Sequence, residues 1–121
     1  MTTQGHHEAT RPYQLGIDVG STTIKAVVLD GNRRLFSDYR RHNADVRASL
    51  GVLLADVDRA LPGARVHAAI TGSGGLTTAR AMGIPFVQEV IAGTEATQRL
   101  HPEVDVVIEL GGEDAKLTYL H

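Results

Sequence analysis

The sequence predicts an α/β protein with a mixed sheet, and three observations support this class. The first is a series of three strand-like segments, joined by short turns, between residues 13 and 40. The second is an apolar stripe of helical period between Asn43 and Leu61. The third is the alternation of strand-like and helix-like segments that follows, which is typical of parallel strands covered by helices. We therefore expect a sheet of three antiparallel-joined strands plus parallel strands, with helices on both faces.

The first three strands are predicted from β-branched composition and turn residues. Tyr13 to Val19 and Thr23 to Leu29 are mostly apolar, and only three residues separate them, which predicts an antiparallel hairpin. Asp30 to Asn32 ("DGN") contains residues that tolerate positive φ, so a second tight turn is expected there. The more polar segment from Arg33 to Arg40 then forms a strand at the edge of the sheet.

The helix from Asn43 to Leu61 is predicted from apolar residues that recur every three or four positions. Asn43 is the expected cap, Asp45 suits the first turn, and Pro62-Gly63 ends the helix. The remaining segments are short. They are a strand at Arg65–Thr71, the turn "GSGG", a helix at about Leu76–Met82, a strand at Ile84–Glu89, a helix at about Val90–Leu100, a buried strand at Asp105–Leu110, the turn "GGED" and a strand at Ala115–Leu120.

Composition excludes several classes of function. The 121 residues carry a net charge of −2, which gives no support to a general polyanion-binding surface, so no nucleic-acid partner is expected. Cys is absent, which excludes disulfides and thiolate metal sites in this chain. No run has the length of a membrane span and residues 1–12 lack the apolar core of a signal peptide, so we expect a cytoplasmic protein with a disordered lead-in. His6-His7 in that lead-in is interpreted as incidental.

The stretch "GIDVGSTTIKAVVLD" carries the main candidate site. Gly20 allows a phosphate to approach closely, and the hydroxyls of Ser21, Thr22 and Thr23 add hydrogen-bond donors. Asp18 would repel a phosphate unless a divalent cation lay between them, so it is a candidate Mg²⁺ ligand, directly or through water. Lys25, in the following strand, could neutralise phosphate charge or extend into solvent.

A second turn, "ELGGEDAK", repeats the order of strand, acid, glycines, Lys and strand. Glu109 is a second candidate metal ligand, and Gly111 and Gly112 suit a second phosphate loop that faces the first across a cleft. An Asp or Glu could orient an attacking water in phosphoryl transfer; Asp18 is one candidate, and the family resemblance given below places Glu113 and Asp114 near that water or the metal. Each turn also has an alternative interpretation without a ligand. The first would be a polar hairpin turn capped by Asp18, and the second a solvated acidic turn at Glu109–Asp114.

Other phosphate and catalytic motifs fit less well. A Walker lysine is absent, and "TGSGGL" at 71–76 lacks the last glycine and the distal acid of a dinucleotide fingerprint. We expect this loop to line the cleft or to permit close strand–helix packing. No nucleophile–base pair is evident, and the scattered histidines, including His42 and His67, are interpreted as surface or structural residues.

Four motifs in this order, "DVGSTTIK", "ITGSGG", "QEVIAGTEA" and "VIELGGEDAK", resemble the 2-hydroxyacyl-CoA dehydratase activators and the ATPase subunits of benzoyl-CoA reductases. These belong to the acetate kinase, sugar kinase, heat-shock chaperone and actin superfamily. The resemblance covers about Leu15 to Leu120 and is strongest to large fused activase-related proteins. It implies a ribonuclease-H-like lobe, with residues 13–104 in the first lobe and 105–121 as the opening hairpin of a second.

The resemblance also implies an activity. Such activators bind ATP and Mg²⁺, form homodimers that share a four-iron four-sulfur cluster, and couple ATP hydrolysis to electron delivery to a dehydratase or reductase partner. It assigns Asp18 as the Mg²⁺-linked acid, Gly20 to Thr23 as the first phosphate loop, and Glu109, Gly111 and Gly112 as the second motif. Many activators carry Gln-Asp where this chain has Glu113-Asp114, which replaces an amide that could orient water.

The cluster cysteines and adenosine-binding motif of the family follow the second motif, so we expect the 121 residues to be a truncated lobe. Alone it should bind ATP or ADP weakly or not at all, and should not hydrolyse ATP. Its last hairpin should expose an apolar edge that pairs with its own lobe or with another copy; we expect a dimer, which a strict monomer in light scattering would contradict. Two alternatives stay open: a small-molecule kinase lobe, and a non-catalytic actin-like assembly or regulatory module.

Overall fold

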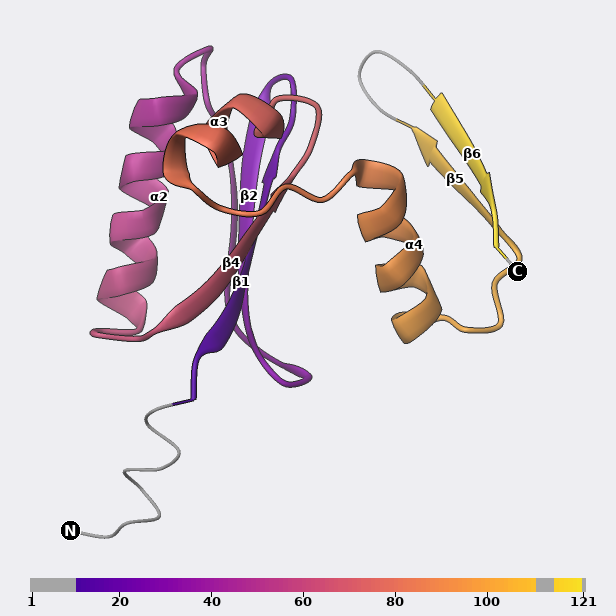
Figure 1. Cartoon of the computed structure of the whole chain (residues 1–121), viewed down its shortest axis with the longest axis horizontal. Helices are drawn as coiled ribbons and strands as arrows, with labels where there is room; N and C mark the ends of the chain where they lie inside the picture. The colour runs from indigo at the N-terminus through magenta and orange to yellow at the C-terminus, as the bar shows by residue number, and fades with distance from the viewer. Residues whose placement is uncertain (1–10, 111–114, 121) are drawn as a thin grey trace, which may run out of the picture. The chain divides into compact units, whose positions relative to one another are not determined.

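A computed structural model describes residues 11–110 and 115–120 (Figure 1). The chain folds as two compact units, Met1–Phe86 and Val87–His121, and each is described by itself. The helices and strands follow in chain order: β1 (Tyr13–Val19), β2 (Thr23–Asp30), β3 (Arg33–Arg41), α2 (Val46–Ala60), β4 (Val66–Thr71), α3 (Gly75–Met82), α4 (Glu89–Leu100), β5 (Val106–Leu110) and β6 (Ala115–Tyr119).

The first unit contains a four-stranded mixed sheet of order β3-β2-β1-β4. The two hairpins are antiparallel, and β4 returns parallel to β1 after the helix α2, as the sequence predicts. Strand β3 lies at the edge, and the turn before it places Gly31 at φ 61, the positive value that its sequence favours. The predicted α/β class with a mixed sheet is confirmed.

Both helices of the first unit pack on the same face of the sheet (Figure 1). Alternate residues of each strand point toward them, because side chains in a strand alternate between its two faces. The core is made of buried apolar side chains from β1, β2, β4, α2 and α3. They are Leu15, Ile17, Val19, Ile24, Ala26, Val28, Leu50, Leu53, Val57, Ile70 and Ala79.

Helix α2 begins later than its sequence pattern indicates. The prediction that Asn43 caps the helix is wrong, because Asp45 is the cap and accepts a hydrogen bond from the Ala48 N–H at 3.1 Å. Asn43 and Ala44 instead adopt left-handed backbone conformations with φ 51 and 63. The helix ends as expected before Pro62-Gly63, where Gly63 has φ 71.

The predicted strand at Ile84–Glu89 is also wrong. Its residues form a single parallel bridge, between Phe86 and Ile70, and the Pro85 carbonyl accepts a hydrogen bond from the Ile70 N–H at 2.9 Å. Pro85 has no N–H to donate, so a regular ladder cannot extend through it. The segment therefore touches β4 at one parallel bridge and then leads into α4.

The second unit consists of α4 and the antiparallel hairpin β5–β6. One face of the hairpin is apolar and exposed, and its members are Val106, Ile108, Leu110, Ala115, Leu117 and Tyr119. The predicted burial of β5 is therefore wrong, since Ile108 is 66% and Leu110 81% exposed. A two-stranded hairpin with one helix can bury one of its faces only.

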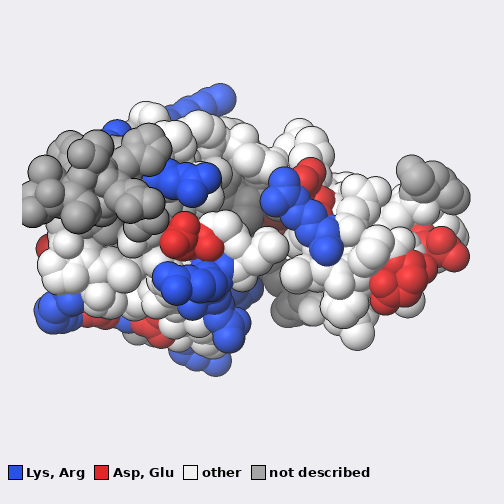
Figure 2. Space-filling view, turned by 90° about the horizontal axis from the view of Figure 1, so that it is seen from below, with Lys and Arg blue, Asp and Glu red and all other residues white. Residues whose placement is uncertain are grey.

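Figure 2 shows Lys and Arg as well as Asp and Glu side chains on one face. Several charged residues of the described chain form exposed ion pairs close in sequence, such as Arg33 with Asp30 at 3.8 Å and Arg99 with Glu95 at 3.0 Å. Pairs of this kind contribute about 0–1 kcal/mol each to stability. Of the helices described here, none is long and apolar enough to cross a membrane.

Candidate functional site: two glycine loops at the carboxyl ends of β1 and β4

The candidate site lies where the parallel strands β1 and β4 end. Asp18 and Thr71 are register partners, so their side chains lie next to each other on the sheet face opposite the helices. Each strand continues into a glycine-containing loop, residues 20–22 after β1 and 72–74 after β4. Ligands of open α/β sheets bind outside the carboxyl ends of parallel strands, so this is the edge where a site is expected.

Asp18 keeps much of its hydrogen-bonding capacity free. Its side chain is 40% exposed and its Oδ2 lies 3.5 Å from the Nζ of Lys25, its cross-strand partner on β2. Lys25 also lies over the ring of Tyr39, 5.9 Å from the centroid. An exposed ion pair of this length is weak, so both charges can be redirected to a ligand at little cost.

The first loop is a tight turn with exposed hydroxyls. The Gly20 N–H donates to the Thr23 carbonyl at 2.8 Å, which closes the turn between β1 and β2. Ser21 and Thr22, between them, are exposed. The predicted loop of Gly20 to Thr23 therefore exists as a compact turn, and its hydroxyl groups are accessible to a ligand.

The second loop packs directly on the first. The Gly74 N–H donates to the Val19 carbonyl at 2.9 Å. Gly72 has φ +104, and a Cβ there would lie 2.3 Å from the Val19 carbonyl oxygen and 2.5 Å from Oδ1 of Asp18. Only glycine fits this position, for reasons of both space and backbone conformation. Of the two roles predicted for "TGSGGL", lining a cleft stays a prediction; the structure shows that the loop contacts Asp18 at Gly72.

The other predicted role, close packing of a helix on a strand, is seen one turn later. A Cβ at Gly75, the first residue of α3, would lie 2.9 Å from Cγ2 of Ile70 and 3.1 Å from the ring of Phe86. Gly75 thus lets α3 approach β4 closely. The same short motif therefore both fixes the helix and carries the loop that touches Asp18.

Thr71 carries an unsatisfied hydroxyl. Its Oγ1 is buried and has no hydrogen-bond partner among the residues that the structure describes. A buried hydroxyl without a partner costs about 1–3 kcal/mol. Such groups in native proteins mark a strained or functional position, and this one is adjacent to Asp18 in the sheet.

The second predicted motif lies in the other unit. Glu109 is on β5, and its Oε1 would be 3.1 Å from a Cβ at Gly93 of α4. Its cross-strand partner Lys116 is ion-paired with Glu89 at 3.2 Å. The predicted site residues Gly111, Gly112, Glu113 and Asp114 lie outside the described residues. Among residues 11–110 and 115–120, no three His, Asp or Glu side chains cluster as a metal site.

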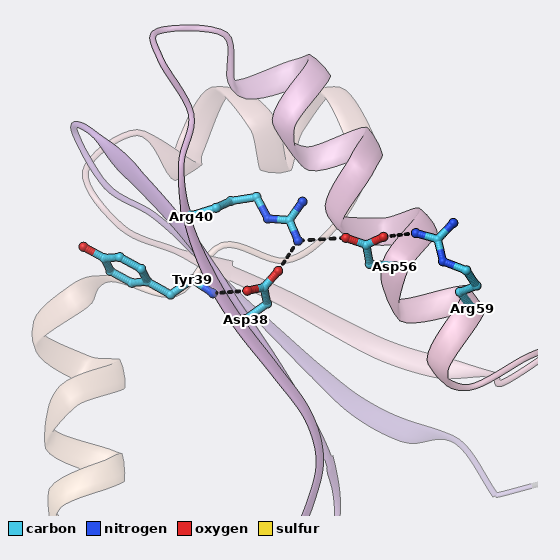
Figure 3. A network of polar contacts seen from close by, with 5 residues as sticks. All are labelled: Asp38, Tyr39, Arg40, Asp56 and Arg59. Carbon is cyan, nitrogen blue, oxygen red and sulfur yellow. Dashed lines mark hydrogen bonds and ion pairs between the residues drawn. The ribbon is translucent and has the colours of Figure 1, made fainter.

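A polar network fastens α2 to the edge strand β3 (Figure 3). Arg40 donates to Asp38 on its own strand and to Asp56 of α2 at 2.8 Å, and Arg59 also pairs with Asp56. The hydrogen bond from Arg40, followed by that from the Tyr39 N–H, holds the pKa of Asp38 below its ordinary 3.8. The Arg40 hydrogen bond likewise lowers the pKa of Asp56. These bonds secure the two elements that flank residues 42–45.

Sequence reasoning missed one residue that contacts the site. His42 follows β3 and is 5% exposed, and its Nε2 lies 3.0 Å from the Gly20 carbonyl oxygen. The two residues are 22 positions apart, so no local spacing pattern could reveal this contact. The antiparallel register of β2 and β3, which pairs Thr23 with Arg41, is what brings them together.

Comparison with solved structures shows the fold that this chain shares. It is similar to the (R)-2-hydroxyglutaryl-CoA dehydratase component A of Acidaminococcus fermentans, with TM-score 0.79 and 22% identity over 92% of this chain and 44% of that one. It is also similar to the activator of the 2-hydroxyisocaproyl-CoA dehydratase from Clostridium difficile with bound ADPNP, with TM-score 0.73 and 24% identity over 90% of this chain and 41% of that one.

A third similar structure is the ethanolamine utilization protein EutJ of Carboxydothermus hydrogenoformans, with TM-score 0.64, 20% identity and coverage of 91% and 48%. The chain thus spans less than half the length of each of these proteins. No protein-family profile and no curated protein matches the sequence. The described chain therefore has a ribonuclease-H-like, actin-like fold.

Proposed function

We propose that this chain is the nucleotide-binding lobe of an ATP-dependent activator. The observation that carries the proposal is the contact of two glycine loops at the carboxyl ends of β1 and β4, beside Asp18 and the unsatisfied hydroxyl of Thr71. An acid, a cation and several donors converge there, and the acid and the cation are joined only by a weak, exposed ion pair at 3.5 Å. Such an arrangement suits a ligand that is itself both anionic and metal-bound.

The residues fit a magnesium–phosphate group. Asp18 offers one exposed carboxylate, and Mg²⁺ in nucleotide sites is held through one or two carboxylates together with phosphate oxygens and water. When bound, Mg²⁺ would neutralise phosphate charge. Lys25 would do the same from the neighbouring strand, and Ser21 and Thr22 would donate to phosphate oxygens.

The second motif completes the proposed set of roles. We assign Gly111 and Gly112 to a second phosphate loop, Glu109 to metal binding, and Glu113 and Asp114 to the orientation of a water molecule. These roles follow from the resemblance of "VIELGGEDAK" to the activator motif. They would depend on the same acid–glycine chemistry that we propose for Asp18 at the end of β1 and for Gly20 after it.

The finer proposal concerns the partner. Two of the similar structures are a component and an activator of 2-hydroxyacyl-CoA dehydratases, and one of them holds ADPNP. We infer that the protein couples ATP hydrolysis to electron delivery to a dehydratase or related reductase. In this proposal it works as a homodimer, with an iron–sulfur cluster held by residues beyond this sequence.

The test compares two identical substitutions at opposite ends of one sheet. Asp18→Asn removes the proposed metal ligand, and Asp30→Asn removes an exposed acid at the far end of β2. ATP affinity of each protein is measured with Mg²⁺ and with EDTA, by amide-resolved NMR titration. In the wild type, Mg²⁺ should strengthen binding, because it bridges two anionic groups.

Asp18→Asn should abolish this benefit of Mg²⁺ and should strengthen binding of metal-free ATP, because a repulsive charge is gone. Asp30→Asn should behave like the wild type in both conditions. The same dependence on Mg²⁺ in Asp18→Asn and the wild type would contradict the proposal. Circular dichroism of the variants establishes that the fold is retained.

A further inference from the structure

His42 makes more hydrogen bonds to the first glycine loop than a core residue requires. Its backbone N–H donates to the Thr22 carbonyl at 3.1 Å, and its ring Nε2 lies 3.0 Å from the Gly20 carbonyl oxygen. A single residue thus engages the carbonyl on each side of Ser21. It does so from a buried position, at the end of β3.

The hydrogen bonds define which ring nitrogen carries the proton. The Ala44 N–H donates to Nδ1 at 3.1 Å, so Nδ1 must supply a lone pair and has no proton. The proton of the neutral ring is therefore on Nε2, which donates it to the Gly20 carbonyl. Both ring nitrogens are satisfied in this tautomer, as burial requires.

The segment after His42 is shaped to keep the ring in place. Asn43 and Ala44 have φ 51 and 63, conformations that cost non-glycine residues about 1–3 kcal/mol each. The His42 carbonyl accepts from the Asp45 N–H at 2.8 Å and from Ser49 Oγ at 3.3 Å. These bonds hold the strained turn in the conformation in which the Ala44 N–H points toward Nδ1.

The consequence for the loop is electrostatic. A carbonyl oxygen carries partial negative charge and would repel a phosphate, whereas N–H and hydroxyl groups attract it. Because the Gly20 and Thr22 carbonyls are both engaged by His42, they are not available to face an anion. Ser21, between them, is exposed, so its hydroxyl and N–H can face an anion.

We propose that His42 is a positioning residue for phosphate binding: its Nε2–H fixes the Gly20 carbonyl and so holds the loop of residues 20–22 in the conformation that receives an anion. This rests on the proposed nucleotide-binding function of that loop. His42 does not touch the ligand itself. It acts through the backbone of Gly20 and Thr22.

Two substitutions separate the two ring hydrogen bonds. In His42→Gln the side-chain amide reaches as far as Nε2 and can still donate to the Gly20 carbonyl. In His42→Asn the shorter side chain can accept from the Ala44 N–H but cannot reach Gly20. If the role of His42 were merely structural, both variants would destabilise the protein, and the loop of residues 20–22 would behave alike in the two.

The experiment uses the whole chain and three readouts. Ring ¹⁵N shifts report the tautomer, amide exchange of residues 21–23 reports the loop, and Mg-ATP titration reports affinity. In the wild type we expect the ring proton on Nε2. In His42→Asn we expect faster amide exchange in the loop and about tenfold weaker Mg-ATP binding, because one buried hydrogen bond is lost. His42→Gln should restore both.

The outcomes distinguish this inference from the function on which it rests. A ring protonated on Nδ1, or equal Mg-ATP affinity in the Asn and Gln variants when the wild type binds, would overturn the role of His42. A wild type whose loop amides do not respond to millimolar Mg-ATP would overturn the proposed function. The apo tautomer and exchange data would still decide whether His42 holds the loop.

Discussion

Gly72→Ala is the substitution whose effect the structure specifies most sharply. The added Cβ would lie 2.3 Å from the Val19 carbonyl oxygen, 2.5 Å from Oδ1 of Asp18 and 2.7 Å from the Val19 carbonyl carbon. Two of these three atoms belong to the backbone of β1 and cannot rotate away. The φ of +104 adds strain that any L-residue would carry there.

The magnitude follows from these two effects. Overpacking costs about 1–3 kcal/mol and an unfavourable φ a similar amount, so Gly72→Ala should cost about 2–6 kcal/mol. Since domains are stable by about 5–15 kcal/mol, this is a large part of the total. The Asp18 carboxylate must also move, so Mg-ATP binding should weaken in whatever protein remains folded.

Two matched controls separate the causes. Gly83→Ala has a left-handed φ of +67 but open space around it, so it should cost about 1–2 kcal/mol. Gly51→Ala, in the interior of α2 with nothing within 4 Å, should stabilise by up to about 1 kcal/mol. Urea unfolding followed at amides of β1 and β4 measures all three. A cost at Gly72 no greater than that at Gly83 would refute the reasoning.

Three further results are expected. Arg40 lowers the pKa of Asp38 and Asp56 below 3.8, so the two carboxylates stabilise the fold above that pH, and this contribution is lost as pH falls through their folded-state pKa values. Urea unfolding midpoints measured against pH should show this loss, and the midpoints of Arg40→Met should depend less on pH. Thr71→Val replaces an unsatisfied buried hydroxyl with a methyl of the same shape, so thermal denaturation should show equal or greater stability while Mg-ATP binding weakens; unchanged binding would exclude Thr71 from the site. Asp18→Asn should remove the Mg²⁺ dependence of ATP affinity, as described above, and an unaltered dependence would count against the metal role.

Much of the sheet could be predicted because local chemistry determines it. The three-residue connection after Val19 and the glycine at position 31 each specify a hairpin, so the pairing of Asp18 with Lys25 follows from register alone. The apolar period of α2 likewise indicated its buried face. These signals lie within a few residues of one another, which is why sequence reasoning reached them.

The start of α2 could not be predicted, because its cause is tertiary. Asn43 is as good a capping residue as Asp45, and nothing local requires an alanine at φ 63. The conformation exists because the ring of His42 takes the Ala44 N–H and the Gly20 carbonyl at once. The contacts of a buried polar side chain therefore place the cap of the helix two residues later than predicted, at Asp45 instead of Asn43.

Only part of the candidate site could be predicted, because some of its features are local in sequence and others depend on tertiary contacts. Asp18 and the loop of residues 20–23 stand in one motif, and the sequence therefore identified them together. The contact of Gly72 with Asp18 depends on how two loops pack, and the unsatisfied Thr71 hydroxyl depends on burial. Neither property can be read from spacing, although a strand followed by several glycines did mark the right segment.

Paramagnetic broadening by Mn²⁺ bound to ATP tests the central claim most directly, because Mn²⁺ takes the same oxygen ligands as Mg²⁺. We predict that amide signals of residues 18–23 and 72–74 broaden first, that the Gly31 turn at the far end of the sheet stays sharp, and that Mn²⁺ without ATP broadens the loops far less. Broadening centred away from Asp18, or identical broadening with and without ATP, would contradict the account.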